Sequence, residues 1–463
     1  MQQRVRTDRL ATRSTRELVL TALRARGPMS RADLARYANV APSTISGVVQ
    51  ELLLAGLVVA SPHQADAAQP GRPGLSLTLN PRLGAVAGVE FCFDEVRVLL
   101  CDLAHDVIGT ARCELPQAHT SDTALAAAGK LVGEALTAAG LGRDALIRAG
   151  VSVPGPVSRH PAAVTPSGIL PGWHGVTAGE IADALGVAVS IDNDSNLAAL
   201  GEHAWGAGRG CDDSVTLKFH YGIGCGLFVN GALVRGRGGA GEIGHIAVDE
   251  RGPLCRCGKR GCLETYAAIS AIMEALRPQH GKLTLAQLMR LLAVRDPGAV
   301  RVVGDAAELI GMHLATVCNL LAPQRVIIVG PMAQAGELVV EPIRTAVKRR
   351  IAPNAIPEIV LGALGSRNTA LGAIALALDE TDWLPVKRPR GARQAADAGL
   401  PRAARRIHPV RHGVFTPCGA AYSPRAARRT HPVPHGVFDP VLPRLPPGVQ
   451  ASPLFPRSAD LPL

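Results

Sequence analysis

One histidine and three cysteines in the middle of the chain have the residue types and the spacing of a metal site. His245 is followed by Cys255, Cys257 and Cys262, and the cysteines form a Cys-x-Cys-Gly-x-x-Gly-Cys pattern. Thiolate and imidazole are ligands that Zn²⁺ prefers, and four protein ligands leave no coordination position for a reacting water. The glycines allow the backbone to wrap closely around an ion. The pattern therefore predicts a structural zinc site.

The neighbours of these cysteines favour metal binding over an alternative in which the thiols pack as small hydrophobic side chains. Arg256, Lys259 and Arg260 alternate with the cysteines, and such charged neighbours do not fit an apolar core. Glu242 and Glu264 flank the loop on its two sides. Two carboxylates held by a rigid loop fit the recognition of a polyol.

A second group of polar residues stands where a strand runs straight into a helix. Asn193 and Asp194 lie between an apolar strand, 187–191, and a helix predicted over 196–205. Ligands of α/β sheets usually bind outside the carboxyl ends of the strands. A carboxylate there can take a proton from a hydroxyl or accept its hydrogen bond. Capping of the helix is the alternative, and this segment by itself favours the cap.

The N-terminal region predicts a helix-turn-helix. Three short helices are expected over 15–26, 31–37 and 41–55, with Ser30 as the cap of the second and Gly56 at the end of the third. Two short helices joined by a tight turn are typical of this motif. A three-helix packing module that does not bind DNA is the alternative for the helices alone.

Polar residues on the third helix suit DNA. Ser43, Thr44, Ser46 and Gln50 remain on its outer side when its apolar residues face the core. Short hydroxyl and amide side chains near a helix N-terminus can reach phosphates and base edges in a major groove.

A wing and a local positive charge strengthen the DNA-binding interpretation. A strand that starts at Gly56 can pair with Leu75–Leu79, and Gly71–Arg72–Pro73–Gly74 lies between them. An arginine between Gly and Pro is thin enough to enter a narrow minor groove. The first 80 residues contain ten Lys/Arg and five Asp/Glu, whereas the next 300 contain 26 and 29. A basic head on a near-neutral body indicates a nucleic-acid partner.

After Ala85 the pattern changes to alternating strands and helices, which indicates an α/β body of two lobes. The predicted strands are 86–93, 96–102, 147–153, 187–191, 214–219, 226–230 and 325–329, and the predicted helices are 124–139 and 196–205.

These motifs together resemble those of the ROK family, whose name joins repressors, open reading frames and kinases. The resemblance runs from about residue 12 to 378, and the zinc motif is its most specific part. It implies an α/β actin-like body of two lobes (sugar kinase, ribonuclease H-like) behind an N-terminal winged helix-turn-helix. It also implies that the residues which bind zinc are His245, Cys255, Cys257 and Cys262.

The resemblance further implies sugar hydroxyl contacts from Asn193, Asp194, Glu242, His245 and Glu264. In kinase members, the residue that matches Asp194 is the general base that activates the sugar hydroxyl. The expected DNA contacts, taken from the head, are Arg31, Ser43, Thr44, Ser46, Gln50 and Arg72.

Three phosphate-binding elements depart from the kinase pattern. Glu90–Phe91–Cys92–Phe93–Asp94 replaces an Asp-x-Gly-Gly-Thr-like turn, His220–Tyr221–Gly222–Ile223–Gly224 replaces Gly-Thr-Gly-x-Gly, and Gly330–Pro331 replaces a Gly-Gly pair. Asp94 would repel a phosphate by about 4 kcal/mol at ~4 Å and a surface-like dielectric. We therefore predict that Asp194 is a sugar ligand and that the chain is not an enzyme. An ATP-dependent sugar kinase with Asp194 as catalytic base is the alternative.

Two further departures concern specificity. Ile169 stands where kinase relatives often place an asparagine before Leu-Pro-Gly-Trp, so one polar sugar contact is expected to be missing. Gly47 stands where many related recognition helices have a long polar residue.

The expected domains are a winged helix-turn-helix at 12–80, a first lobe at 84–205 completed by 367–380, a second lobe with the zinc loop at 206–366, and a tail at 385–463. The tail is rich in Pro and Arg and has no periodicity, which predicts disorder. Segments 401–415 and 424–438 differ at only two of fifteen positions. We favour a recent gene-level duplication over an accessory electrostatic DNA arm.

The sequence as a whole predicts a sugar-responsive transcription regulator, expected to be a repressor. Its partners would be double-stranded operator DNA and a sugar, and it would act as a homodimer or homotetramer. Sugar binding would shift the lobes and change the spacing of two heads, which half-sites fix at about 34 Å. A DNA-binding protein with a vestigial sugar site is a further alternative.

The start of the chain and its cysteines bear on localisation. Five arginines lie among the first sixteen residues, without the apolar stretch of a secretory signal. No apolar run approaches the ~18 residues of a membrane helix. We therefore expect a cytoplasmic protein, whose ten cysteines do not form a disulfide framework.

Overall fold

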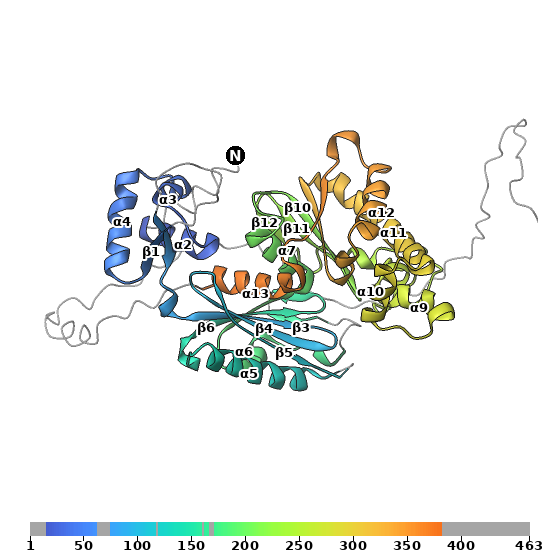
Figure 1. Ribbon diagram of the computed structural model, residues 1–463, viewed down its shortest axis with the longest axis horizontal. Coiled ribbons are helices and arrows are strands. Elements are labelled where there is room, and N and C mark those ends of the chain that lie inside the picture. Colours follow the sequence, from blue (N-terminus) through green and yellow to red (C-terminus); the bar gives the residue numbers. More distant parts are fainter. Residues whose placement is uncertain (1–14, 63–74, 117–118, 160–161, 166–170, 382–463) are drawn as a thin grey trace, which may run out of the picture. The chain divides into compact units, whose positions relative to one another are not determined.

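The computed structural model describes residues 15–62, 75–116, 119–159, 162–165 and 171–381 (Figure 1). The Gly-Arg-Pro segment with Arg72, the Ile169 position and the repeat-containing tail lie outside these residues. None of the described helices is long and apolar enough to cross a membrane.

The described residues of the head form three helices and a two-stranded wing. Its helices are α2 (Thr15–Arg26), α3 (Arg31–Ala38) and α4 (Pro42–Leu54), and its antiparallel strands are β1 (Val58–Pro62) and β2 (Leu75–Leu79). The predicted helices and wing pair are therefore present, with ends that differ by one residue or a few.

Local signals in the sequence set the helix ends of the head. The Ser30 hydroxyl accepts a hydrogen bond from the Asp33 backbone N–H at 3.1 Å, and the Asp33 carboxylate accepts one from the Ser30 N–H at 3.2 Å. This reciprocal capping box satisfies two N–H groups that the helix itself leaves free. Asn39 and Gly56 have φ angles of 52° and 68°, the left-handed conformation that ends a helix.

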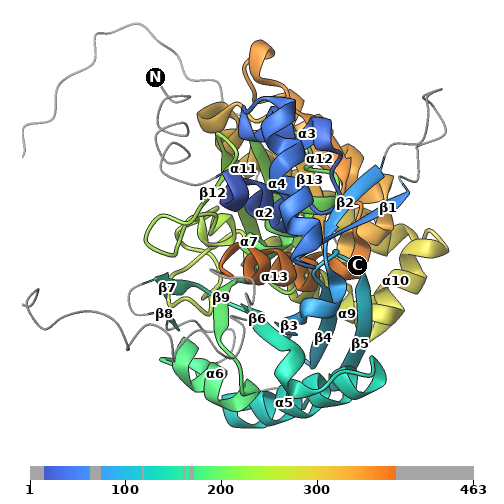
Figure 2. The same cartoon turned by 90° about the vertical axis from the view of Figure 1, so that its left-hand side faces the viewer.

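The first body sheet has the strand order β5-β4-β3-β6-β9. Its strands are β3 (Ala85–Phe91), β4 (Glu95–Asp102), β5 (Val107–Glu114), β6 (Leu146–Val153) and β9 (Val189–Asn193). β3, β6 and β9 run parallel, whereas β4 and β5 are antiparallel neighbours. The helices α5 (Ser121–Ala138) and α6 (Ala178–Leu185) cover one face (Figure 2). A short hairpin of β7 (Val157–Arg159) and β8 (Ala162–Val164) follows β6.

The second body sheet has the order β12-β11-β10-β13-β14. Its strands are β10 (Ser214–Phe219), β11 (Ile223–Val229), β12 (Ala232–Val234), β13 (Arg325–Val329) and β14 (Glu358–Leu361). The accompanying helices are α8 (Glu264–Ala267), α9 (Ile269–His280), α10 (Leu285–Ala293), α11 (Pro297–Leu321) and α12 (Glu337–Lys348). The buried side chains of this sheet and these helices form one apolar core.

Two helices, α7 (Asp194–Trp205) and α13 (Asn368–Asp379), pack against each other between the sheets. Glycines allow this packing. A Cβ atom at Gly150 of β6 would lie 1.8 Å from the Ala373 carbonyl oxygen, and one at Gly372 would lie 1.7 Å from the Leu197 carbonyl oxygen. Neither distance is possible for a real side chain, so the two helices and the first sheet meet backbone to backbone.

The structure differs from the sequence-based prediction at several boundaries in the body. The strand predicted over 187–191 is β9, which begins at Val189 and ends at Asn193, and α7 begins at Asp194 instead of residue 196. The exposed edge strand β5 was not predicted. Its residues are mostly partly or fully exposed, so it lacks the apolar pattern that marks the buried strands.

The glycine contacts of α13 give the first testable prediction. Gly372→Ala places a methyl group against the Leu197 carbonyl, so we expect a loss of unfolding free energy of about 1–3 kcal/mol from overpacking. Gly304→Ala in α11 is the matched control, because a Cβ atom there meets no atom within 4 Å. That change should be neutral or stabilising by up to about 1 kcal/mol through helix propensity. Urea unfolding of both variants measures the difference, and equal stabilities would contradict the packing argument.

Candidate functional site

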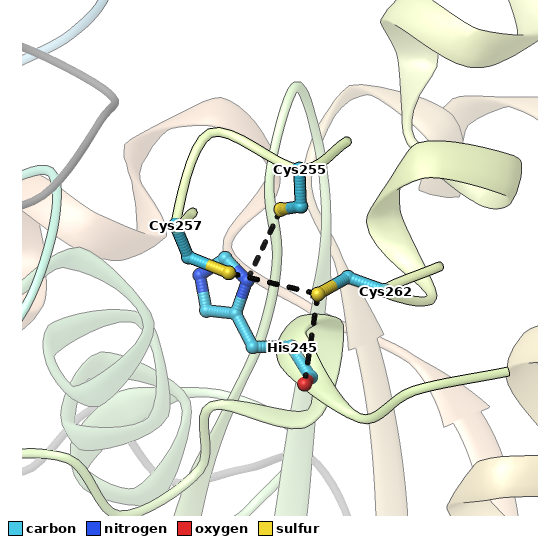
Figure 3. A group of neighbouring side chains, drawn as sticks. All are labelled: His245, Cys255, Cys257 and Cys262. Carbon is cyan, nitrogen blue, oxygen red and sulfur yellow. Dashed lines mark hydrogen bonds between the residues drawn. The ribbon is translucent and has the colours of Figure 1, made fainter. Parts of the chain in front are cut away.

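The four predicted metal ligands lie together in the structure. The ligand atoms of His245, Cys255, Cys257 and Cys262 are all within 4.8 Å of one another (Figure 3). Cys257 Sγ lies 3.6 Å from Cys262 Sγ, and Cys255 Sγ lies 3.6 Å from His245 Nδ1. In a tetrahedral site with Zn–S bonds of about 2.3 Å, neighbouring sulfurs are roughly 3.8 Å apart. The donor set and its spacing therefore fit a zinc ion.

Backbone hydrogen bonds and two glycines shape this loop. The Cys255 N–H donates to the Lys259 carbonyl at 2.7 Å, and the Gly258 N–H donates to the Cys255 carbonyl at 2.9 Å. Gly258 and Gly261 have φ angles of 84° and 64°. At Gly261 a Cβ atom would also lie 1.5 Å from the Asp249 carbonyl oxygen, so only glycine fits that position.

A cavity of about 370 Å³ lies beside the metal cluster and is lined by residues of both body sheets. The residues predicted to contact a sugar all line it, and they are Asn193, Asp194, Glu242, His245 and Glu264. The structure thus brings together side chains that come from the β9–α7 junction, the zinc loop and α8.

Asn193 and Asp194 have different hydrogen-bond partners. Asn193 is the N-cap of α7, because its Oδ1 accepts from the backbone N–H groups of Ser195 and Asn196 at 2.9 and 3.3 Å. Its Nδ2 donates to the Gly155 carbonyl at 2.9 Å. Asp194, the first residue of the helix, instead directs its carboxylate to Lys218 Nζ, 2.9 Å from Oδ2.

Lys218 was not recognised from the sequence. It belongs to β10, and its ammonium also lies 3.3 Å from Thr369 Oγ1 and 3.8 Å from Glu90 Oε1. Burial alone would raise the pKa of Asp194, but the charge and hydrogen bond of Lys218 hold it below its usual value. The available signal was a single charged residue within the apolar run 215–219.

The other two carboxylates have different environments. Arg256, from the zinc loop, donates to Glu264 through Nε at 2.8 Å and through Nη2 at 3.2 Å. His245 Nε2 lies 3.8 Å from Glu242 Oε2. Burial, together with the negative charges of Asp194 and Glu264, raises the pKa of Glu242 to about 7. His245 therefore turns one ring nitrogen to the thiolates and the other to the cavity.

Aromatic side chains lie where the sequence comparison placed the altered phosphate-binding turns. Phe93, after β3, and Tyr221, between β10 and β11, have ring centroids 5.9 Å apart. Both residues line the cavity, as do Gly330 and Pro331.

On the head, Ser43, Thr44, Ser46 and Gln50 are exposed on α4, as expected, and Arg31 is partly exposed. The N-terminus of α4 follows Ala41, and no side chain of the described head caps it. Its first N–H groups therefore remain available to an anion such as a DNA phosphate. Arg72, the sixth predicted DNA contact, lies outside the described residues.

Known proteins match both parts of the chain. The ROK family model matches residues 86–380, and the MarR family model matches residues 14–67. The xylose repressor of Bacillus subtilis strain 168 is 26% identical over 368 residues, which cover 78% of this chain and 94% of the repressor. The glucokinase of Thermotoga maritima is 33% identical over 246 residues, which cover 49% of this chain and 78% of the kinase.

Solved structures agree with these matches. A crystal structure of a ROK family transcriptional regulator, described as a homologue of the Escherichia coli MLC protein, aligns with a TM-score of 0.63 at 26% identity. The alignment covers 79% of this chain and 96% of that one. The predicted fold, an actin-like body of two lobes behind a winged helix, is therefore confirmed. Because its family model covers more than half of the sequence, this chain belongs to the ROK family.

Proposed function

We propose that this ROK protein is a sugar-responsive DNA-binding transcription regulator that acts as a repressor. A hydrogen-bonded path between the cavity and the head carries the proposal. The helix α7 begins at Asp194 in the cavity and ends at Trp205, whose Nε1 donates to His105 Nδ1 at 3.3 Å. His105 Nε2 in turn lies 2.8 Å from the carbonyl oxygen of Arg24 in α2. A ligand that moves α7 therefore acts on a group bonded to the head.

His105 has only one protonation state that satisfies both partners. Trp205 Nε1 is a donor, so Nδ1 must accept, and the Arg24 carbonyl is an acceptor, so Nε2 must carry the proton. Burial lowers the pKa of His105 and favours this neutral tautomer. A Cβ atom at Gly27 would lie 2.9 Å from His105 Nδ1, so the turn after α2 must be glycine for the ring to reach this position.

Apolar packing supports the same connection. The buried residues Leu23 of α2 and Ile374 and Leu378 of α13 belong to one core cluster. Arg24 also donates to the Thr381 carbonyl just after α13. The head thus contacts α13 directly, and α13 in turn packs against α7.

We propose that the head contacts operator DNA through α4 and the wing. Ser43, Thr44 and Gln50 would reach base edges and phosphates, and Ser46 would accept from DNA, since its own proton is bonded to the Pro42 carbonyl at 2.9 Å. Arg31 and Arg72 would complete the contacts. Two heads in a homodimer or homotetramer would read half-sites about 34 Å apart.

The metal is proposed to be structural zinc held by His245, Cys255, Cys257 and Cys262. Four protein ligands give it no open position, so when bound it supplies rigidity and charge to the loop and no reacting water. The loop fixes His245 and Arg256 beside the cavity, and through Arg256 it also fixes Glu264. Asn193, Asp194, Glu242, His245 and Glu264 would contact the sugar.

An ATP-dependent sugar kinase is the second candidate, because the glucokinase of Thermotoga maritima is 33% identical to this chain over its aligned residues and the xylose repressor 26%. Two features favour the regulator. The ring of Phe93 stands where a phosphate-binding turn needs glycine, with the ring of Tyr221 5.9 Å away, and Asp194 is already paired with Lys218. A general base needs a pKa near the working pH, whereas that of Asp194 is lowered.

The function is tested by operator binding with and without sugars. DNA selected from a random pool by the full-length protein serves as the operator, and a panel of pentoses, hexoses and amino sugars serves as the ligands. We expect one sugar to change operator affinity by about 5–150-fold, which corresponds to a coupling of 1–3 kcal/mol.

In a coupled ATP assay the same sugars should give no turnover. Phosphorylation that Asp194→Asn abolishes would contradict the regulator, and calorimetry with no sugar binding at millimolar concentration would indicate a vestigial site.

The metal is tested by its content and by its removal. Wild-type protein should contain about one zinc per chain, and Cys257→Ser should lower both zinc content and thermal stability, since binding and folding of the loop are coupled. Cys113→Ser is the matched control, because that thiol is exposed and lies on β5 away from the cluster. Elemental analysis and thermal unfolding measure the two effects. A Cys257→Ser protein with unchanged metal content would refute the assignment.

A further inference from the structure

Lys218 is the one charged side chain in β10, and it is buried with the strand's other residues. Its ammonium contacts three separate elements: Asp194 of α7 at 2.9 Å, Thr369 of α13 at 3.3 Å and Glu90 of β3 at 3.8 Å. The lysine comes from the second sheet, whereas both carboxylates belong to the first lobe. Lys218 is therefore a cation of the second lobe that pairs with two carboxylates of the first lobe in the lining of the cavity.

A purely structural ion pair would explain the burial but not the position. Lys218, Asp194 and Glu90 all line the cavity, where a ligand can reach them. Oε2 of Glu90 has no hydrogen-bond partner among the described residues, and its nearest cation is Arg97 Nη1 at 3.6 Å. An unsatisfied buried acceptor beside an ammonium indicates that the hydrogen bonding of this group is incomplete without a ligand.

The hydrogen-bonding capacity of the pair fits a hydroxyl. An ammonium has three protons, and Lys218 uses two of them on Asp194 and Thr369. Asp194 has acceptor capacity beyond its bond to Lys218. A hydroxyl both donates and accepts, so one placed between these groups can donate to Asp194 and accept the third proton of Lys218.

We propose that Lys218 is a specificity-determining residue of the sugar site, which binds one sugar hydroxyl together with Asp194 and keeps Asp194 a permanently ionised acceptor. The inference rests on the proposed function, because it takes the ligand to be a sugar. It explains how a carboxylate at this position can recognise a hydroxyl without removing its proton. Removal of the lysine would leave Asp194 buried without its counter-ion, whereas Glu90 would keep Arg97 nearby.

Other titrating groups surround the pair, and they enter the design of the test. The charged and titratable groups that act on Asp194 or Lys218 are Glu90, Cys92, His220 and Glu242, and behind them lie Arg97 and Glu264. Burial and the charge of Lys218 lower the pKa of His220 to about 3, so it stays neutral above pH 5. The charge of Asp194 is one of the causes that raise the pKa of Glu242, so a change at Asp194 also changes Glu242. A pH dependence is therefore assigned to Asp194 by comparing proteins in which Asp194 is present with proteins in which it is absent.

The test compares full-length wild type with Lys218→Met, which keeps length and removes charge, by calorimetry with D-xylose, D-glucose and N-acetyl-D-glucosamine. At pH 7.5 the variant should bind the recognised sugar about 10–150-fold more weakly, since a charged hydrogen bond is lost. The Kd ratio of variant to wild type should grow further as pH falls from 8 to 5.5, because burial without the ammonium raises the pKa of Asp194. Lys130→Met is the control, because Lys130 is exposed on α5 and should leave all affinities unchanged. A Kd ratio near one at every pH would overturn the proposal.

The Asp194→Asn variant and thermal unfolding without sugar test whether the effect of Lys218 acts through Asp194. Asp194→Asn should weaken binding, and in that background Lys218→Met should change Kd by a factor that does not vary with pH; a factor that varies as in Lys218→Met alone would refute the assignment to Asp194. In thermal unfolding, the deficit in Tm of Lys218→Met should be largest at pH 8 and shrink toward pH 5, as the orphaned carboxylate takes up a proton. A pH-independent deficit overturns the claim that Lys218 keeps Asp194 ionised. A wild type that binds no sugar contradicts the proposed function, while the thermal result still decides the state of Asp194.

Discussion

The close approach of α13 to α7 and to the first sheet is the constraint on which the other features depend. Gly88 and Gly150 of the sheet and Gly201 and Gly372 of the helices each lie so near a carbonyl oxygen that a Cβ atom would come within 2.3 Å of it. Interfaces packed at this density have discrete arrangements and do not deform gradually. A displacement of α7 at its cavity end must therefore be passed on to α13 and to the head that packs on it. The hydrogen bonds of His105 to Trp205 and to the Arg24 carbonyl join the end of α7 to the head by a second route.

The charges of the cavity are arranged in pairs. Asp194 is bonded to Lys218 and Glu264 to Arg256, and Asp192, which precedes the cavity residue Asn193, is bonded to Arg235. Each buried pair restrains its carboxylate in one orientation, which prepares it to accept from a hydroxyl at little further cost in entropy. Lys218 belongs to the second sheet, and Arg256 belongs to the loop that contains Cys255 and Cys257. The recognition chemistry therefore depends on the relative position of the lobes, which is the property that a sensor must report.

Sequence patterns predicted the parts of this protein that depend on local chemistry. The cluster of His245 and three cysteines, the helix cap at Ser30 and the apolar strands carry their signals in residue type and spacing, and the structure contains them. Partners far apart in the sequence could not be predicted. Nothing in the run 215–219 indicates that Lys218 meets Asp194, and nothing near His105 indicates Trp205 or Arg24. Such contacts follow from the packing of α7 and α13, which only the fold specifies.

The link between cavity and head is tested most directly by Trp205→Phe, which keeps an aromatic ring against His105 but removes the N–H donor together with one of the two fused rings. The quantity to measure is the ratio of operator affinities with and without saturating sugar, in full-length wild type and variant. The account predicts unchanged sugar affinity and a smaller ratio, by about 2–13-fold for the loss of one hydrogen bond of 0.5–1.5 kcal/mol. A variant that binds the sugar normally and releases DNA as wild type does would contradict it.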